Sequence, residues 1–367
     1  MRVVFTGGGT GGHIYPALAV AQQCKEEYPE SQFLYIGGQH GLESTIVPAQ
    51  SMEFKAINIT GFKRKLSFEN IKTVIRFMYG VRSSKKWLRQ FKPNVVIGTG
   101  GYVCGPVVYA AAKMGIPTII HEQNAVPGLT NRFLSKYVST VAVSFEDGLH
   151  AFPDAKKIIY TGNPRATTVY LADKKKGYES LGIAQHTKIV LVVGGSRGAQ
   201  AINNAMIAMS KQLYKLLNVH IVYVTGEKYF ASTHEAISAQ LGKIPSCLSV
   251  VPYVHNMPEM LAATSLIVNR AGASFLAEIN ALGIPSILIP SPNVTNNHQE
   301  KNARMLEKNK AAKVILEPDL TGEVLFQEIQ HIMRNSAVHS EMSAASRKLG
   351  KPDSAHLIVE EMKSIAK

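Results

Sequence analysis

The chain has 367 residues, of which 46% are hydrophobic and 18% are charged, with 40 Lys and Arg against 26 Asp and Glu. This length favours two domains, and the composition excludes a disordered chain. No apolar run approaches the ~20 residues that span a bilayer. The N-terminus lacks the features of a signal peptide, so we expect a cytoplasmic protein. Cys24, Cys104 and Cys247 are too widely separated to predict a disulfide or a metal site.

The first half of the chain alternates short apolar strands with helical segments, beginning with a helix over residues 14–28. The expected strands are Arg2–Thr6, Gln32–Ile36, Phe54–Ile59, Asn94–Ile97, Thr118–Ile120 and Val138–Val143. Such an alternation predicts a parallel sheet that is covered by helices on both faces.

The second half repeats this plan, and Gly162 and Pro164 punctuate the chain between the halves. We therefore predict domains at residues 1–162 and 163–367. The tail from Ser336 is expected to be helical, with a break at 350–352 and a last helix able to pack back on the first domain. The expected strands are 188–193, 220–224, 248–251, 266–268 and 286–289, and the expected helices are 200–217, 272–282 and 297–309.

Each half contains a glycine-rich turn between its first strand and the helix that follows. Gly7–Gly12 in the first half is echoed by Gly194–Ala199 in the second. Glycine lets the backbone bend sharply and approach a ligand closely, because it has no Cβ atom. The N-terminus of the following helix attracts anions. Both turns therefore predict phosphate binding.

The first turn also fits the G-x-G-x-x-G pattern of dinucleotide-binding folds. In those folds an acidic residue that binds the ribose follows the second strand. Here no carboxylate follows Ile36 until Glu43, so a nicotinamide or flavin nucleotide is the less favoured hypothesis. A Walker phosphate loop is excluded because neither turn ends in Gly-Lys-Ser/Thr.

Several polar residues stand where α/β sheets collect ligands, although each can also have an ordinary structural role. His13 directly follows the first turn, where a near-neutral imidazole can take a proton from a hydroxyl group. A second polar group, His121–Asn124, follows the strand at 118–120. In the second half, Glu278 is suited to a ribose diol and the side chains of 296–300 are suited to sugar hydroxyls.

The net charge of +14 is concentrated between Thr60 and Lys92, where ten Lys or Arg stand against the single acid Glu69. Apolar residues lie among these cations at helical spacing. Part of that stripe must cover the sheet, and we expect the rest to contact an anionic membrane surface. A plain solvated helix is the alternative, and no nucleic-acid-binding motif accompanies the charge. The expected membrane-binding residues are Lys63, Arg64, Lys65, Lys72, Arg76 and Trp87.

The motifs occur together in the order found in one protein family. They are Gly7–His13, Gly100–Pro106, His121–Asn124, Gly162–Arg165, Gly194–Ala199, Arg270–Ala273 and Gln299. On these residues, and over almost its whole length, the chain resembles the bacterial N-acetylglucosaminyltransferases that make lipid II for peptidoglycan.

The resemblance implies an α/β fold of the GT-B type, with two Rossmann-like, doubly wound parallel-sheet domains facing a cleft. It implies inverting, metal-independent transfer of GlcNAc from UDP-GlcNAc to the C4 hydroxyl of the muramyl sugar in the undecaprenyl-diphosphate-linked pentapeptide acceptor, lipid I. The first domain would bind the acceptor and the membrane, and the second would bind UDP-GlcNAc. The enzyme would use no cofactor and would lie peripherally on the inner face of the cell membrane, where it would serve cell wall synthesis.

The resemblance also assigns roles to single residues. His13 is the leading candidate for the catalytic base, with Glu122 second. The backbone of Val254 would read the uracil, Glu278 the ribose and Gln299 the sugar. Arg165 and the amides near Ser196 would stabilise the departing UDP. The substrate-binding residues implied are Thr10, Gly11, Gly12, Asn124, Arg165, Ser196, Val254, Ala273, Ser274, Phe275, Leu276, Ala277, Glu278 and Gln299.

Three rival functions remain open at this level. A GT-B glycosyltransferase with another acceptor and a UDP-sugar epimerase would share the two-domain plan. A basic phosphate- or lipid-binding module without catalysis would share the charge distribution. Assays of transfer and of epimerisation distinguish the three.

Overall fold

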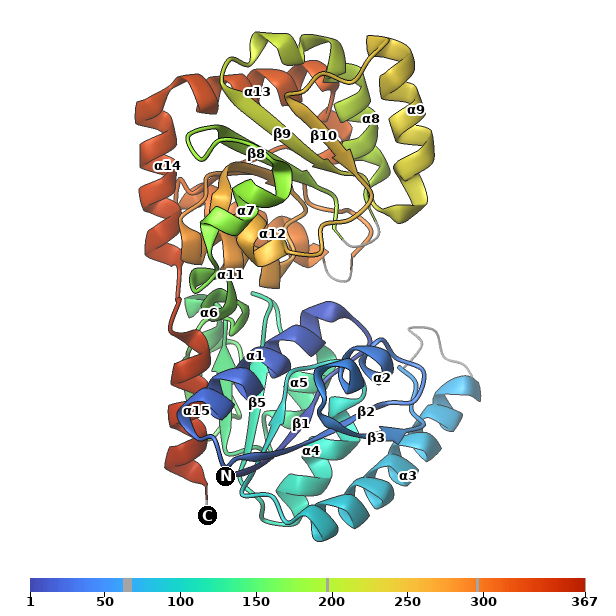
Figure 1. Ribbon diagram of the computed structural model, residues 1–367. Helices are drawn as coiled ribbons and strands as arrows, with labels where there is room; N and C mark the ends of the chain where they lie inside the picture. Colours follow the sequence, from blue (N-terminus) through green and yellow to red (C-terminus); the bar gives the residue numbers. More distant parts are fainter. Residues whose placement is uncertain (62–67, 196–197, 295–296, 367) are drawn as a thin grey trace. The chain divides into compact units, whose positions relative to one another are not determined.

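The computed structural model describes residues 1–61, 68–195, 198–294 and 297–366. The chain forms two compact units (Figure 1). The first contains Met1–Thr167 and the segment from Lys351 onward, and the second contains Thr168–Gly350. Each unit is built around one sheet in which every described strand pair is parallel. The predicted fold class, two Rossmann-like parallel-sheet units, is confirmed.

The sheet of the first unit has the strand order β3-β2-β1-β4-β5-β6-β7. Its strands are β1 (Arg2–Thr6), β2 (Gln32–Gly38), β3 (Glu53–Ile57), β4 (Val95–Gly98), β5 (Thr118–Glu122), β6 (Thr140–Val143) and β7 (Ile158–Tyr160). Its helices are α1 (Gly11–Glu27), α2 (Glu43–Ile46), α3 (Phe68–Phe91), α4 (Cys104–Lys113), α5 (Leu129–Leu134), α6 (Arg165–Tyr170) and α15 (Ser354–Ile365), with short 3-10 turns at Pro48–Gln50 and Glu146–His150.

The sheet of the second unit has the order β10-β9-β8-β11-β12-β13. Its strands are β8 (Lys188–Val193), β9 (Val219–Val224), β10 (Leu248–Val251), β11 (Thr264–Asn269), β12 (Ser286–Leu288) and β13 (Ala312–Val314). Its helices are α7 (Lys174–Leu181), α8 (Gln200–Met209), α9 (Phe230–Leu241), α10 (Met257–Ala263), α11 (Ala273–Leu282), α12 (His298–Lys308), α13 (Gly322–Arg334) and α14 (Ser336–Leu349), with 3-10 turns at Ser210–Lys215, Glu227–Tyr229 and Glu317–Asp319.

Most predicted elements lie within a few residues of their observed bounds, and the differences have local causes. The helix expected over 200–217 ends at Met209 and continues as the 3-10 turn Ser210–Lys215. Strands β7 and β13, of three residues each, were not predicted because their sequences show no strand periodicity. The tail breaks as expected, since α14 ends at Leu349 and α15 begins at Ser354.

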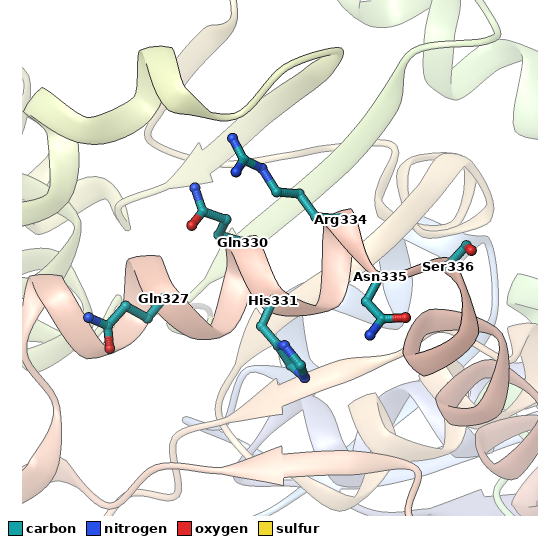
Figure 2. A pocket seen from close by; sticks show the side chains of 6 residues that line it. All are labelled: Gln327, Gln330, His331, Arg334, Asn335 and Ser336. Carbon is teal, nitrogen blue, oxygen red and sulfur yellow. The ribbon is translucent and has the colours of Figure 1, made fainter.

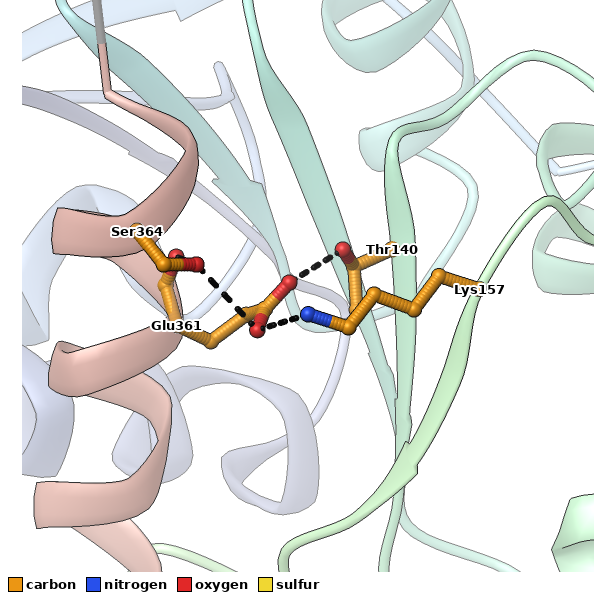
Figure 3. A network of polar contacts seen from close by, with 4 residues as sticks. All are labelled: Thr140, Lys157, Glu361 and Ser364. Carbon is orange, nitrogen blue, oxygen red and sulfur yellow. Dashed lines mark hydrogen bonds and ion pairs between the residues drawn. The ribbon is translucent and has the colours of Figure 1, made fainter.

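Helix α15 belongs to the first unit and packs along α1 (Figure 1). Its Glu361 is buried and contacts Thr140 of β6 and Lys157, which directly precedes β7 (Figure 3). Thr140 donates a 2.5 Å hydrogen bond to one carboxylate oxygen, and the Lys157 ammonium lies 2.6 Å from the other. At the start of the segment, the Thr167 hydroxyl donates to the Pro352 carbonyl at 2.7 Å. These contacts attach the last helix to the first unit.

The strand order reverses between β1 and β4 in the first sheet and between β8 and β11 in the second. At such a point the loops that leave neighbouring strands diverge to opposite faces and open a crevice at the carboxyl ends of the strands. The register places Thr6 beside Gly98 and Val193 beside Asn269. The two glycine turns therefore follow the strands at which each sheet is able to bind a ligand.

Candidate active site

The first glycine turn is held by its neighbours rather than left open. Gly9 adopts a left-handed conformation, with φ at +83°. The Gly8 amide donates to the Gly100 carbonyl at 3.2 Å, and the Gly9 amide donates to a Glu43 carboxylate oxygen at 3.0 Å. An anion at this turn would therefore be met by the start of α1 rather than by these two amides.

Glu43 is fully buried beneath the turn. Its second carboxylate oxygen accepts a 2.9 Å hydrogen bond from the Gly38 amide. The surrounding glycines make room for it, because a Cβ on Gly8 or Gly41 would lie 2.2 or 2.3 Å from its oxygens. The carboxylate thus joins the end of β2 to the turn after β1.

The tautomer of neutral His13 follows from its hydrogen bonds. Its Nδ1 lies 2.9 Å from the Gly8 carbonyl oxygen, which can only accept, so Nδ1 carries the proton. The Thr10 hydroxyl lies 3.3 Å from the same nitrogen. Nε2 is then left with a lone pair, as a base requires. Thr99 fixes the backbone here by donating a 2.6 Å hydrogen bond to the His13 carbonyl.

Burial lowers the pKa of His13 below its ordinary value. The hydrogen bond to Gly8 and the negative charges of Glu122 and Glu43 oppose this effect and raise the pKa. Because burial is the largest influence, the imidazole stays neutral to a lower pH than an ordinary histidine. A neutral imidazole with a free Nε2 lone pair is the form that can accept a proton.

The turn after β4 packs directly on the first glycine turn. Gly100 and Gly101 are both left-handed, with φ at +104° and +81°. A Cβ on Gly100 would lie 2.8 Å from His13 Cδ2 and 3.1 Å from its Nε2, and a Cβ on Gly101 would lie 2.3 Å from the Gly8 carbonyl oxygen. Both positions need glycine for conformation and for space.

Glu122, at the end of β5, is buried and accepts four hydrogen bonds from its own loop. One carboxylate oxygen accepts from the backbone and side-chain amides of Asn124, at 3.0 and 3.2 Å. The other accepts from the Gly128 amide at 3.0 Å and from the Asn131 side chain at 2.9 Å. These bonds order the loop after β5.

The two residues on either side of Glu122 form a separate buried network. The Gln123 side-chain amide donates to the Thr99 carbonyl at 2.7 Å and lies 3.0 Å from His121 Nδ1. His121 Nε2 lies 2.9 Å from the Gly162 carbonyl and donates to it. Burial lowers the pKa of His121 to about 4, so this ring is neutral at physiological pH.

Arg165 begins α6, and its guanidinium lies over the Tyr15 ring at 5.3 Å. Tyr15 is two residues beyond His13 on α1, so this cation–π contact brings a positive charge to the start of that helix. The first unit therefore gathers Thr10, Gly11, Gly12, His13, Glu122, Asn124 and Arg165 around the turns after β1 and β5.

The second unit has a pocket of about 290 Å³ where its strand order reverses. Of the substrate-binding residues expected there, Phe275 and Gln299 line it. The Gln299 side-chain oxygen accepts from the Ser291 amide at 2.9 Å, which turns its NH₂ group to other partners. The lining residues are Val193, Gly194, Gly195, Gly198, Asn269, Arg270, Gly272, Phe275 and Gln299.

Two family models cover most of the chain. The glycosyltransferase family 28 N-terminal domain matches residues 3–143, and the family 28 C-terminal domain matches residues 189–358. The chain belongs to glycosyltransferase family 28. The resemblance inferred from the motifs is thereby confirmed.

Individual relatives of this family 28 chain match along its entire length. The UDP-N-acetylglucosamine–N-acetylmuramyl-(pentapeptide) pyrophosphoryl-undecaprenol N-acetylglucosamine transferase of Bacillus cytotoxicus is 52% identical over 100% of both chains. The crystal structure of Acinetobacter baumannii MurG is 29% identical, covers 99% of both chains and has a TM-score of 0.77. The UDP-GlcNAc 2-epimerase from Neisseria meningitidis, bound to UDP-GlcNAc, is 14% identical over 99% of this chain and 100% of its own, with a TM-score of 0.66. This last likeness shows a shared fold and nothing more.

The remaining site residues predicted for this family 28 chain are placed as follows. Val254 is buried in the loop after β10, and Ala273–Glu278 form the first turns of α11, with Glu278 buried. Ser196 lies outside the described residues, as do Lys63, Arg64 and Lys65.

A larger hollow of about 530 Å³ lies elsewhere on the second unit and contains no predicted site residue. It is lined by the end of α13 and the start of α14. Figure 2 shows that the Arg334 and His331 side chains point away from each other, so no set of polar groups converges there. The smaller pocket, which contains Phe275 and Gln299, is therefore the better candidate for a ligand-binding site in the second unit.

Sequence reasoning gave no role to several residues that the structure brings to these sites. Gly100 packs against the His13 ring, and Gln123 Oε1 borders the space beside Gly100. Glu43 supports the turn before His13, and Asn269 and Arg270 line the smaller pocket. Each lies within or beside a recognised motif except Glu43. The sequence indicates the buried position of Glu43 only through the glycines at 8, 37, 38 and 41, which leave room for its side chain. That relation can be recognised only when the pairing of the strands is known.

The surface of α3 is apolar as well as basic. Val74, Ile75, Met78 and Tyr79 are 50 to 66% exposed. Trp87, in contrast, packs partly against the core. Among the described residues, no helix is long and apolar enough to cross a membrane.

Proposed function

We propose that this chain transfers GlcNAc from UDP-GlcNAc to the C4 hydroxyl of the muramyl sugar of an undecaprenyl-diphosphate-linked muramyl pentapeptide. The observation that carries the proposal is the full-length match, at 52% identity, to an enzyme named for this reaction. The geometry supports it with a neutral, correctly protonated histidine beside a glycine turn and a separate pocket in the second unit. The reaction belongs to peptidoglycan synthesis.

In this proposal His13 is the general base. As the acceptor C4 oxygen attacks C1 of GlcNAc, its proton passes to the lone pair on His13 Nε2, and the bond from C1 to the UDP oxygen breaks. A single displacement of this kind inverts the anomeric centre. His13 suits the task because the Gly8 carbonyl fixes the proton on Nδ1, and because burial keeps the imidazole neutral.

Glu122, the second candidate, fits a supporting role better. Both of its oxygens are occupied by donors from residues 124–131, so its lone pairs already stabilise the loop. Its negative charge also raises the pKa of His13 and so strengthens the base. We propose that Glu122 orders the loop after β5 and raises the pKa of His13.

The second unit would bind the donor. The turn after β8 and the start of α8 would face the UDP diphosphate, as amides at a helix N-terminus favour anions. Glu278 at the start of α11 would accept from the ribose, the Val254 backbone would read the uracil, and the Gln299 NH₂ group would donate to the sugar. Arg165 and the residues around Ser196 would stabilise the charge that develops on the leaving group.

The first unit would hold the acceptor and dock on the membrane through α3. Exposed apolar residues there lie among exposed cations, including Lys72 and Arg82. A surface of this kind inserts shallowly into an anionic leaflet and is attracted to its charge. Because the lipid acceptor is held in the membrane, we propose that the protein works peripherally on the cytoplasmic face. Trp87 contributes little to this contact, since it is half-buried against the core.

The test is a turnover assay of the purified chain with radiolabelled UDP-GlcNAc and a lipid-linked muramyl pentapeptide in detergent. We expect equimolar UDP and a β1,4-linked disaccharide product, with loss of turnover in His13→Gln. An epimerase would instead produce a second UDP-sugar without acceptor. The absence of transfer across a range of detergents and acceptor chain lengths would contradict the proposal.

A further inference from the structure

We infer that Gln123 is a positioning residue whose side-chain carbonyl stabilises the protonated form of His13. The inference rests on the proposed function, in which His13 is the base. It concerns one atom, Gln123 Oε1, which is buried and has no hydrogen-bond partner among the described residues. Buried polar atoms are nearly always paired, so an unpaired one at a reacting centre calls for a functional explanation.

The orientation of the Gln123 amide follows from its partners. Its nitrogen donates to the Thr99 carbonyl at 2.7 Å, and a carbonyl can only accept. The same nitrogen lies 3.0 Å from His121 Nδ1, which is unprotonated because Nε2 of that ring donates to Gly162. Exchanging the oxygen and nitrogen of the amide would place acceptors against acceptors. The carbonyl oxygen must therefore be the unpaired atom.

This carbonyl oxygen and His13 Nε2 border the same small space beside Gly100. A Cβ on Gly100 would lie 3.1 Å from His13 Nε2 and 3.5 Å from Gln123 Oε1. In the neutral enzyme Nε2 carries a lone pair, because Nδ1 holds the proton. Two acceptors thus border one space, and no donor of the described residues pairs with Gln123 Oε1 there. A single proton on His13 Nε2 would turn one of these acceptors into a donor to the other.

Catalysis supplies that proton. When the acceptor hydroxyl gives its proton to His13 Nε2, its oxygen bonds to C1 of GlcNAc and UDP leaves. The new N–H group then lies across the space beside Gly100 from Gln123 Oε1 and can donate to it after a small side-chain movement. The positive charge of the imidazolium then lies near the carbonyl dipole of Gln123, which favours the protonated form. After transfer, the proton leaves Nε2 to solvent and the lone pair is restored. Gln123 would thus make His13 a stronger base without touching substrate.

Other groups also act on His13 and remain unchanged in the test. They are the carboxylates of Glu122 on β5 and Glu43 at the start of α2, with the Gly8 carbonyl and the Thr10 hydroxyl at Nδ1. The first three raise the pKa of His13. A change confined to Gln123 Oε1 therefore reports on that atom.

The experiment is a titration of His13 by NMR in the full-length chain labelled with ¹⁵N-histidine, with the resonance assigned by its loss in His13→Gln. Gln123→Met removes the carbonyl and should lower the pKa of His13 by about one unit, as loss of a charge-assisted hydrogen bond predicts. In Gln123→Glu the oxygen that replaces the amide nitrogen faces the Thr99 carbonyl and His121 Nδ1, so the carboxyl group holds a proton there. The other oxygen keeps the acceptor toward His13, and the pKa of His13 should stay close to its wild-type value. A shift in Gln123→Met that Gln123→Glu does not share would not arise from general damage to the network.

Ser144→Ala is the matched control. Ser144 lies 3.3 Å from His121 Nε2, in the same buried network but away from His13, so this variant should leave the pKa of His13 unchanged. The inference is wrong if both Gln123 variants shift the pKa alike, or if Gln123→Met does not shift it. In the wild-type chain below the pKa of His13, the Nε2 proton should be protected from exchange. Rapid exchange there would overturn the inference even if the variants did not fold.

The activity profile provides the second readout. The acidic limb of kcat/KM against pH should move down in Gln123→Met and stay in place in Gln123→Glu, parallel to the NMR titration. Because the titration needs no turnover, a chain without transferase activity would refute the proposed function and still test Gln123. A transferase whose acidic limb ignores both substitutions would refute the role of Gln123 alone.

Discussion

The imidazole of His13 lies where Gly100 has no side chain. A Cβ on Gly100 would come within 2.8 Å of the ring, and the two residues are brought together by the pairing of β1 with β4. The position of the proposed base therefore depends on a glycine 87 positions further along the chain.

Gly100→Ala should reduce kcat/KM by about a hundredfold or more, because the new methyl group displaces the ring and a misplaced catalytic group costs this order of rate. Gly115→Ala is the control. Gly115 is also left-handed, with φ at +71°, but a Cβ there meets nothing within 4 Å. Both variants should lose about 1–2 kcal/mol of unfolding free energy to backbone strain. Steady-state kinetics and urea denaturation measure the two effects, and equal activity in both variants would contradict the steric argument.

The pH dependence of kcat/KM should show an acidic limb below pH 6.5. The base must be neutral to act, and burial lowers the pKa of His13, so activity is lost only as the pH falls through that lowered value. Below it the rate should fall tenfold per unit. His13→Gln should abolish the limb along with most of the rate. A limb centred above the ordinary histidine pKa would show that another group is the base.

Glu122→Gln should destabilise the first unit by about 3 kcal/mol, because an amide offers one acceptor oxygen where four donors converge. We expect a higher KM for the acceptor and an acidic limb that persists, moved to lower pH because the charge that raises the pKa of His13 is gone. Glu53→Gln, at an exposed site on β3, controls for the loss of a carboxylate. Disappearance of the limb in Glu122→Gln would identify Glu122 as the base.

Ile75→Glu with Met78→Glu should weaken binding to vesicles of anionic lipid by at least about tenfold, since both exposed side chains would insert into the leaflet. Turnover of a short-chain, water-soluble acceptor should be unchanged. Tyr214→Glu, at a site 74% exposed on the second unit, is the matched control. Vesicle sedimentation measures the binding. Equal losses in the control would show that any added charge is sufficient.

Glu361→Ala should lower the unfolding free energy of the first unit by about 2 kcal/mol. Most of this comes from the buried Thr140 hydroxyl, which loses its acceptor, while the half-exposed Lys157 contributes little. The neighbouring exposed Glu360→Ala should have almost no effect. Trp87 is the only tryptophan and lies in the first unit, so its fluorescence in urea follows that unit alone. A stable Glu361→Ala would mean that α15 is held by its apolar face.

The sequence by itself determined the fold class, the two-part plan, the glycine turns, His13 and the break before the last helix. These features depend on short spacings: alternation of apolar strands with helices, glycine where the backbone must turn, and glycine and proline at helix ends. Strands β7 and β13 have no such spacing in their sequences and were not predicted. The family resemblance could also be recognised from the sequence, because the family's motifs are short runs of residues in a fixed order.

The tertiary structure alone decided which polar atoms meet. Pairing of β1 with β4 and of β4 with β5 brings His13, Gly100 and Gln123 around one space, although more than 100 positions separate the first from the last. It also decided that the carboxylate of Glu122 is fully engaged and that Trp87 packs inward while Tyr79 is exposed. Spacing along a chain predicts the face of an element but not its neighbours, because sheet order and register are set by burial of the whole apolar surface.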